Sequence, residues 1–210
     1  MTALRAALPK SPRYKIDITF FERYNTYMNK KALAFIANGT EEGELINVVD
    51  ILCRAGVDVK LVSIDGETVT SSHGVKLVAD ALIDGVDLSD VDLLFIPGGM
   101  PGSKRLGECK AVVSAISSAL ESGKRVAAIC AAPALVLGAN GFLKGKRGIC
   151  FPGFEAHMDG CEIAFGARFV TDGNITTARG LGCAIDLGLE LVRLLVGDDK
   201  AQEIKGKIQY

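Results

Sequence analysis

The chain has 210 residues, of which 49% are hydrophobic and 23% are charged, and its formal net charge is -1. This composition suits one folded domain with a large core. A nearly neutral chain offers no basic field to nucleic acid, and no apolar run reaches the length of a membrane span, so we expect neither specific nucleic acid binding nor membrane insertion.

The cysteine pattern indicates a reducing compartment. No two cysteines form a CxxC pair, and no secretory signal pattern opens the chain; the six are Cys53, Cys109, Cys130, Cys150, Cys161 and Cys183. Free thiols of this kind are typical of a cytosolic protein, so we expect a cytoplasmic location. The two histidines, His73 and His157, do not stand at ligand spacing from a cysteine, and we therefore expect no metal site.

The first residues differ from the rest of the chain. Residues 1–28 are basic and aromatic and show no clear period. Three interpretations stay open: an upstream or added segment, a disordered arm, or a transit peptide that would place the protein in an organelle. The acids Asp17 and Glu22 weaken the last of these. We predict a non-catalytic extension over residues 1–28 and a single α/β domain over residues 29–210, so that a chain beginning at Met28 keeps its activity.

From residue 31 onward, strand and helix patterns alternate. Apolar runs predict buried strands at residues 32–37, 57–62, 91–96 and 124–129. Helical spacing predicts helices at residues 42–54, 109–122 and 185–196, with a further turn at 200–205. A hairpin is predicted at residues 68–70 and 75–78, and short strands at 148–151, 167–171 and 175–177. The alternation predicts a mostly parallel sheet with helices on both faces.

Three predicted strands end in unusual residues. Residues 39–44 (Gly-Thr-Glu-Glu-Gly-Glu) follow the first strand, Pro97-Gly98-Gly99 follow another, and Cys130-Ala131 follow the strand at 124–129. In an open parallel sheet these ends lie at one edge, where such sheets bind their ligands. The three segments are therefore expected to converge.

Cys130 stands where a strand gives way to a helix, with Pro133 in the first helical turn. The free N–H groups and positive dipole end of that helix favour a thiolate. The backbone N–H groups of Ala131 and Gly99 would form a two-donor oxyanion hole. The alternative is a small buried residue between strand and helix. We predict a nucleophile that is also the thiol most prone to oxidation.

Among the acids of residues 39–44, Glu44 is the candidate proton carrier. Glu41 and Glu42 are explained by compensation of the helix dipole, whereas Glu44 lies further along the helix and can point inward. A buried carboxylate beside a thiolate is unfavourable, so Glu44 would be protonated or would exchange its proton with the thiol. Residues 98–102 lack the GxGxxG spacing of nucleotide sites, and we expect no cofactor.

Taken together and in this order, four segments resemble the DJ-1/ThiJ/PfpI superfamily, most closely its Parkinsonism-associated and YajL-type branch. They are residues 39–44, the Ile96-Pro97-Gly98-Gly99 strand end, residues 127–133 around Cys130, and Thr177-Ala178-Arg179-Gly180. The resemblance covers residues 29–205. It implies a flavodoxin-like, class I glutamine amidotransferase-like three-layer sandwich and a homodimer. Carried over by position, Cys130 is the nucleophile, Glu44 its acid partner, and Gly99 and Ala131 the backbone donors.

The resemblance implies a function in oxidative and carbonyl stress. It suggests an enzyme acting on 2-oxoaldehydes or their adducts, as a glutathione-independent glyoxalase or a protein or nucleotide deglycase. The alternative is a redox-sensing chaperone whose Cys130 is oxidised to a sulfinic acid, without required turnover. Some relatives carry histidine at the two positions where this chain has Ala131 and Phe151. Without these histidines, Glu44 is the evident proton carrier. Arg179 would bind an anion or brace the site, and a structural salt bridge is equally compatible.

Overall fold

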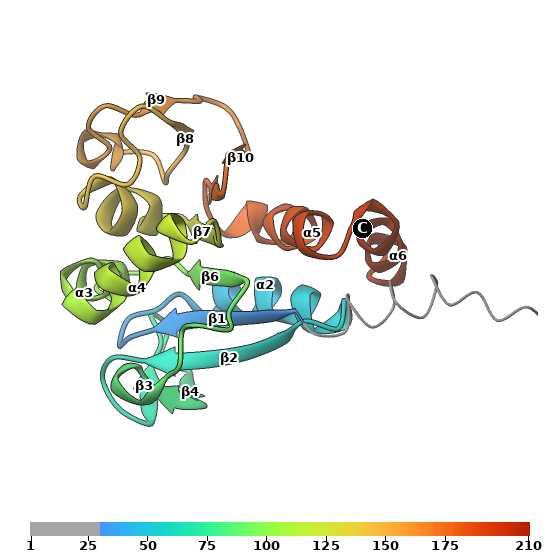
Figure 1. The fold of residues 1–210 in the computed structure, drawn as a ribbon, viewed down its shortest axis with the longest axis horizontal. Coiled ribbons are helices and arrows are strands. Elements are labelled where there is room, and N and C mark those ends of the chain that lie inside the picture. The colour runs from blue at the N-terminus through green and yellow to red at the C-terminus, as the bar shows by residue number, and fades with distance from the viewer. Residues whose placement is uncertain (1–29) are drawn as a thin grey trace, which may run out of the picture.

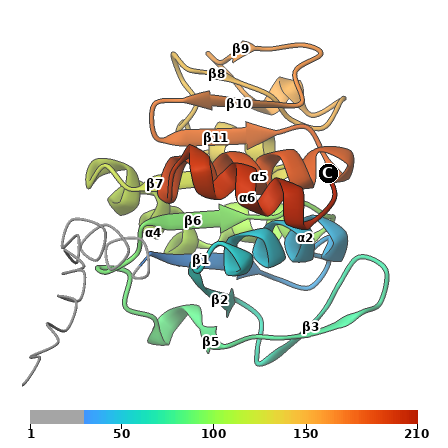
Figure 2. The same ribbon diagram turned by 90° about the vertical axis from the view of Figure 1, so that its right-hand side faces the viewer.

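The computed structural model of the protein describes residues 30–210, so the predicted extension over residues 1–28 lies outside the described part of the chain. The centre of the molecule is a seven-stranded sheet with the order β10-β11-β7-β6-β1-β2-β5 (Figures 1 and 2). All neighbours pair in parallel except β10 and β11. The strands are β1 (Lys31–Ile36), β2 (Asp58–Ser63), β5 (Ala81–Leu82), β6 (Leu93–Ile96), β7 (Arg125–Ile129), β10 (Phe169–Asp172) and β11 (Ile175–Ala178).

Helices cover both faces of this sheet, which makes the fold the predicted three-layer α/β sandwich. Figure 2 shows α2 (Glu42–Arg54), α5 (Ala184–Leu195) and α6 (Asp198–Lys207) in front of the strands. The other face packs against α3 (Gly102–Glu108), α4 (Lys110–Glu121) and the π-helix η2 (Pro133–Gly138). Strand β1 serves both layers, because Ala34 and Ile36 belong to one core and Leu33 and Phe35 to the other.

Most predicted elements are confirmed within one or two residues, and the differences concern short or polar segments. The hairpin is formed by β3 (Thr68–Thr70) and β4 (Lys76–Val78). The predicted last turn at 200–205 is part of the ten-residue helix α6. Among the strands and α-helices, three short elements were not predicted: β5, α3 and β9 (Glu162–Ile163).

The prediction of a strand at residues 148–151 was wrong, because only Gly148 of these residues lies in a strand. Strand β8 covers only Arg147–Gly148 and pairs with β9. The Ile149 N–H donates to the Thr177 hydroxyl (3.0 Å), and the Phe151 N–H donates to the Cys130 carbonyl (2.7 Å). These bonds turn the chain away from the strand direction and bring Phe151 to the candidate site.

No helix within residues 30–210 combines the length and the apolar character that crossing a membrane requires.

Candidate active site

Three chain segments meet at the carboxyl edge of the central strands. Cys130 directly follows β7, Gly98 and Gly99 follow β6, and Glu44 lies in the first turn of α2, which follows β1. Gly98 lies against both reactive side chains, because a Cβ atom on it would collide with the Glu44 carboxylate and with Cys130. Only glycine fits there, and the convergence expected from the sequence is present in the structure.

Cys130 sits on a strained bend. Its φ of 66° is one of two positive values among the non-glycine residues that the structure describes. The strain is held by two backbone bonds, from the Cys130 N–H to the Ala178 carbonyl (2.9 Å) and from the Phe151 N–H to the Cys130 carbonyl (2.7 Å). A sharp strand-to-helix turn of this kind exposes a nucleophile at the top of an α/β sheet.

The Glu44 side chain is almost completely buried, with 1% of its surface exposed. Burial raises its pKa to about 7, and the negative charge of Glu41 acts in the same direction. Hydrogen bonds with the Cys130 thiol and from the backbone N–H groups of Gly98 (3.0 Å, to Oε2) and Leu181 oppose that rise. Glu44 is thus a carboxyl group that gains and loses its proton near neutral pH.

The Cys130 thiol has a raised pKa. Burial and the neighbouring Glu44 carboxylate raise it to about 12, while backbone hydrogen bonds from Ala131 and Gly99 oppose the rise. The effect of the helix start, which favours a thiolate, is therefore outweighed by burial and by the charge of Glu44. The following helix is a π-helix of only six residues, too short to outweigh burial and a neighbouring negative charge.

Glu44 and Cys130 are best described as one titrating pair. When Glu44 is ionised, its charge keeps the proton on sulfur, and when Glu44 takes the proton, that charge disappears. The thiolate is therefore formed together with a protonated Glu44. This exchange of one proton is the chemical capability that the geometry offers.

Backbone donors face the sulfur from two loops. The N–H groups of Gly99 and Ala131 both interact with Sγ of Cys130. The φ of Gly99 is 96°, and a side chain there would collide with the backbone of Glu41 and Gly39. The close approach of the β6 loop to the first loop therefore requires glycine at this position.

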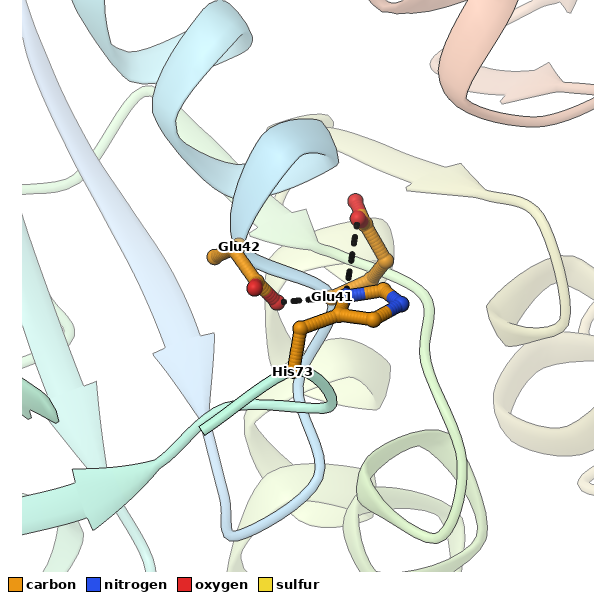
Figure 3. A group of neighbouring side chains, drawn as sticks. All are labelled: Glu41, Glu42 and His73. Carbon is orange, nitrogen blue, oxygen red and sulfur yellow. Dashed lines mark hydrogen bonds and ion pairs between the residues drawn. The ribbon is translucent and has the colours of Figure 1, made fainter. Parts of the chain in front are cut away.

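A second group of titratable side chains borders the site (Figure 3). His73 comes from the turn between β3 and β4, and its Nδ1 lies 3.2 Å from Oε2 of Glu42 and 3.9 Å from Oε1 of Glu41. The ligand atoms of the three residues lie within 4.8 Å of one another, close enough to ligate one cation. Glu41, however, already accepts the Glu44 N–H as the cap of α2, and a helix N-terminus disfavours cations. Helix capping and an ion pair account for this arrangement.

Two further residues singled out from the sequence, Arg179 and His157, lie outside the contact between Cys130 and Glu44. Arg179 follows β11, and its side chain makes no ion pair within residues 30–210, so the salt-bridge interpretation gains no support. Anion binding by Arg179 stays a prediction. His157 ends the 3₁₀ turn η3 (Glu155–His157), is exposed, and has no hydrogen bond to Cys130 or Glu44 in the described chain.

Sequence reasoning missed two neighbours of the site, the turn between β3 and β4 and Leu181, and it noted Phe151 only as a departure from relatives with histidine. The turn between β3 and β4 reaches it, because the Ser72 N–H donates to the Thr40 carbonyl (2.8 Å) and its hydroxyl to the Gly39 carbonyl (2.9 Å). Leu181 supplies an N–H to Glu44, and Phe151 supplies one to Cys130. The motif around Arg179 could have drawn attention to Leu181, which is two residues further on, whereas a contact made by a distant turn leaves no local pattern.

Comparison with known proteins agrees with this architecture. Residues 30–194 match the model of the DJ-1/PfpI family. The chain is 38% identical over 180 residues to protein DJ-1 homolog B of Arabidopsis thaliana, an alignment covering 85% of this chain and 41% of the relative. It is 35% identical over 179 residues to protein dj-1beta of Drosophila melanogaster, covering 84% and 95%. A Caenorhabditis elegans relative, named glutathione-independent glyoxalase DJR-1.2, is 28% identical over 164 residues, covering 78% and 87%.

Solved structures show the same fold. The crystal structure of Drosophila melanogaster DJ-1beta superposes with a TM-score of 0.83 at 33% identity, covering 86% of this chain and 98% of that one. Oxidized Toxoplasma gondii DJ-1 gives 0.81 at 34% identity with the same coverage. The protein belongs to the DJ-1/PfpI family, which confirms the resemblance seen in the sequence. It spans less than half the length of the two Arabidopsis relatives, 41% and 45%.

Proposed function

We propose that the protein is a cysteine-dependent enzyme acting on 2-oxoaldehydes such as methylglyoxal and glyoxal, or on the adducts they form with amines and thiols. The observation that carries the proposal is the contact between the buried Glu44 carboxyl and the Cys130 thiol, with two backbone N–H groups at the sulfur. The name of the C. elegans relative, a glutathione-independent glyoxalase, supports the same reaction class.

The first step joins the substrate to sulfur. Glu44 takes the thiol proton, and the sulfur attacks the aldehyde carbon of R–CO–CHO. The negative charge that develops on the aldehyde oxygen is stabilised by the N–H groups of Gly99 and Ala131 and is neutralised by the proton from Glu44. The product is a hemithioacetal, R–CO–CH(OH)–S–Cys130. From an amine adduct, the same attack expels the amine, which is the deglycase version of the step.

The second step moves one proton. The Glu44 carboxylate removes the hydrogen from the carbon bonded to sulfur, which gives an enediol, and returns that proton to the neighbouring carbon. The hydroxyl proton of the sulfur-bearing carbon passes to the former ketone oxygen, so that the product is the thioester of a 2-hydroxy acid, R–CH(OH)–CO–S–Cys130. Water then cleaves the thioester, releasing R–CH(OH)–COOH and the Cys130 thiol. The overall change is the addition of one water molecule to the oxoaldehyde, so no oxidant, metal or cofactor enters the balance.

The test compares neighbouring glutamates. Glu44→Gln should lower methylglyoxal turnover by roughly 10²-fold, the usual worth of a general acid–base group, and Cys130→Ser should abolish it. Glu42→Gln, on the same helix turn, should leave turnover near the wild-type value. The measurements are loss of methylglyoxal and appearance of the 2-hydroxy acid, with a preformed amine adduct as a second substrate. Normal turnover by Glu44→Gln together with loss in Glu42→Gln would contradict the assignment.

A second candidate is a redox sensor or chaperone in which peroxide oxidises Cys130 to a sulfinic acid. It is favoured by the donors around the sulfur, because a protonated Glu44 and the N–H groups of Gly99 and Ala131 could bind sulfinate oxygens. Mild peroxide followed by peptide mass analysis should then modify Cys130 first. Preferential oxidation of the exposed Cys53 or of the buried Cys183 would argue against it.

We also propose a homodimer, which rests on the family resemblance. Helix α2 is the candidate contact, since Leu45, Val48 and Leu52 are buried in the core while Ile46 on the same helix is 48% exposed. Light scattering at micromolar concentration should give twice the chain mass, and a monomeric mass would count against the proposal.

A further inference from the structure

Three exposed apolar residues stand in the loops that meet at the Cys130–Glu44 pair. Met100, Phe151 and Leu181 are 48%, 46% and 51% exposed. Met100 follows Gly99, Phe151 donates its N–H to the Cys130 carbonyl, and the Leu181 N–H lies close enough to the Glu44 carboxylate to lower its pKa. They come from three separate loops, and exposed apolar groups that gather around reactive polar ones are typical of a small-molecule site.

The Phe151 ring is the best placed of these three side chains. A Cβ atom on Gly180 would lie 3.3 Å from Cδ2 of Phe151 and 3.9 Å from Oε1 of Glu44. The Phe151 ring and the Glu44 carboxylate therefore lie on either side of the buried Gly180, whose lack of a side chain lets the ring approach the carboxylate. The ring of Phe154 packs edge-on against Phe151, with centroids 6.4 Å apart and an interplanar angle of 71°, and supports its orientation.

We propose that Phe151 selects substrates whose carbonyl carries an apolar substituent: 2-oxoaldehydes R–CO–CHO with R an alkyl or aryl group, in preference to glyoxal, where R is hydrogen. The inference rests on the proposed function and adds its substrate class. Phe151 has no proton to give, so it acts by contact with R while Cys130 and Glu44 act on the two carbonyl carbons. An apolar contact of this size discriminates by roughly 10- to 200-fold.

The test measures kcat/KM for phenylglyoxal and for glyoxal. In Phe151→Ala, the phenylglyoxal-to-glyoxal ratio should fall by about tenfold, because the ring contacts the phenyl group of one substrate and hydrogen of the other makes little contact with it. Phe151→Leu, which restores apolar area, should recover part of the ratio. Phe165→Ala removes an aromatic ring that is 77% exposed and should leave the ratio unchanged.

A second measurement separates this inference from the proposed reaction. The sulfur of Cys130 is alkylated by iodoacetamide and by N-benzyl iodoacetamide, with loss of iodide, and peptide mass analysis gives both rates. The benzyl-to-unsubstituted ratio should also fall in Phe151→Ala. If wild type turns over no oxoaldehyde but this ratio still falls, the proposed reaction fails and the apolar selectivity stands.

Two results would overturn the inference. One is an unchanged pair of ratios in a folded Phe151→Ala variant. The other is a fall of the phenylglyoxal-to-glyoxal ratio by the same factor in Phe165→Ala, which would show that the selectivity does not come from the Phe151 ring.

Discussion

Two carboxyl groups at opposite edges of the central sheet stand in different electrostatic surroundings. At the amino-terminal edge, the Lys30 ammonium lies 2.8 Å from Oδ1 of Asp92, and the Lys31 N–H donates to Oδ2 (3.0 Å). At the carboxyl edge, Glu44 is buried beside a thiol on a strained backbone. Both carboxyl groups are largely shielded from solvent, yet Asp92 has a cationic partner and Glu44 forms no ion pair within residues 30–210.

The pKa values of the two carboxyl groups express this difference. For Asp92, hydrogen bonds from Lys30 and Lys31 outweigh the effect of burial, and the pKa is lowered. For Glu44, burial prevails and raises the pKa to about 7. The ionised form is stabilised at Asp92 and destabilised at Glu44, and perturbation of the second kind is what a proton carrier requires. The chemistry of the site therefore lowers the stability of the fold.

The largest effect is expected from Glu44→Gln on the pH dependence of stability. Because the folded pKa is raised from 4.5 to about 7, the folded state holds more protons than the unfolded state between these values, and stability falls as pH rises through them. The loss amounts to at most about 3 kcal/mol. Urea unfolding at pH 5 and pH 8 should show this fall in wild type and a much smaller one in Glu44→Gln.

Glu42→Gln is the control for that experiment. The Glu42 pKa is lowered by its backbone and by hydrogen bonds with His73 and Ser71, against the effect of burial, so its ionised form is the stabilised one. Its contribution is present above pH 4.5 and lost as pH falls. The variant should keep the wild-type fall between pH 5 and pH 8, and loss of that fall would assign the effect to the wrong glutamate.

A smaller effect is expected at the amino-terminal edge. Asp92→Asn removes the ion pair with Lys30 while leaving an oxygen for the Lys31 N–H, and should lower the free energy of unfolding by about 1 kcal/mol or less. Methylglyoxal turnover should be unchanged, since the substitution lies at the opposite end of the strands. Urea unfolding and turnover measured on one preparation check both statements. A tenfold loss of turnover would contradict the assignment of Asp92 to stability alone.

Much of the fold could be predicted because its signals are local. The apolar runs of β1, β6 and β7 and the helical spacing of α2 and α5 predicted these elements, and glycines at strand ends marked the site edge. The two-residue strands β5 and β9 leave no readable period. Helix α3 contributes one large apolar side chain to the core, Leu106, which is too little for a periodic pattern.

The residues of the site could be predicted from the sequence, whereas the charge state of the Cys130 thiol could not. The spacing of Glu44 after Glu42 predicted an inward carboxylate, and the structure places it beside Cys130. The charge state of the thiol depends on how deeply the pair is buried and on which N–H groups reach it. Those quantities come from packing between segments far apart in sequence, and so does the position of Phe151.

The most direct test of the central claim, that Glu44 and Cys130 share one proton, is the pH dependence of Cys130 alkylation by iodoacetamide, followed by peptide mass analysis. Since the Glu44 carboxylate raises the thiol pKa, Glu44→Gln should move the midpoint of alkylation to lower pH even though it slows turnover. Glu42→Gln should leave the midpoint in place. An unchanged midpoint in Glu44→Gln would contradict the account.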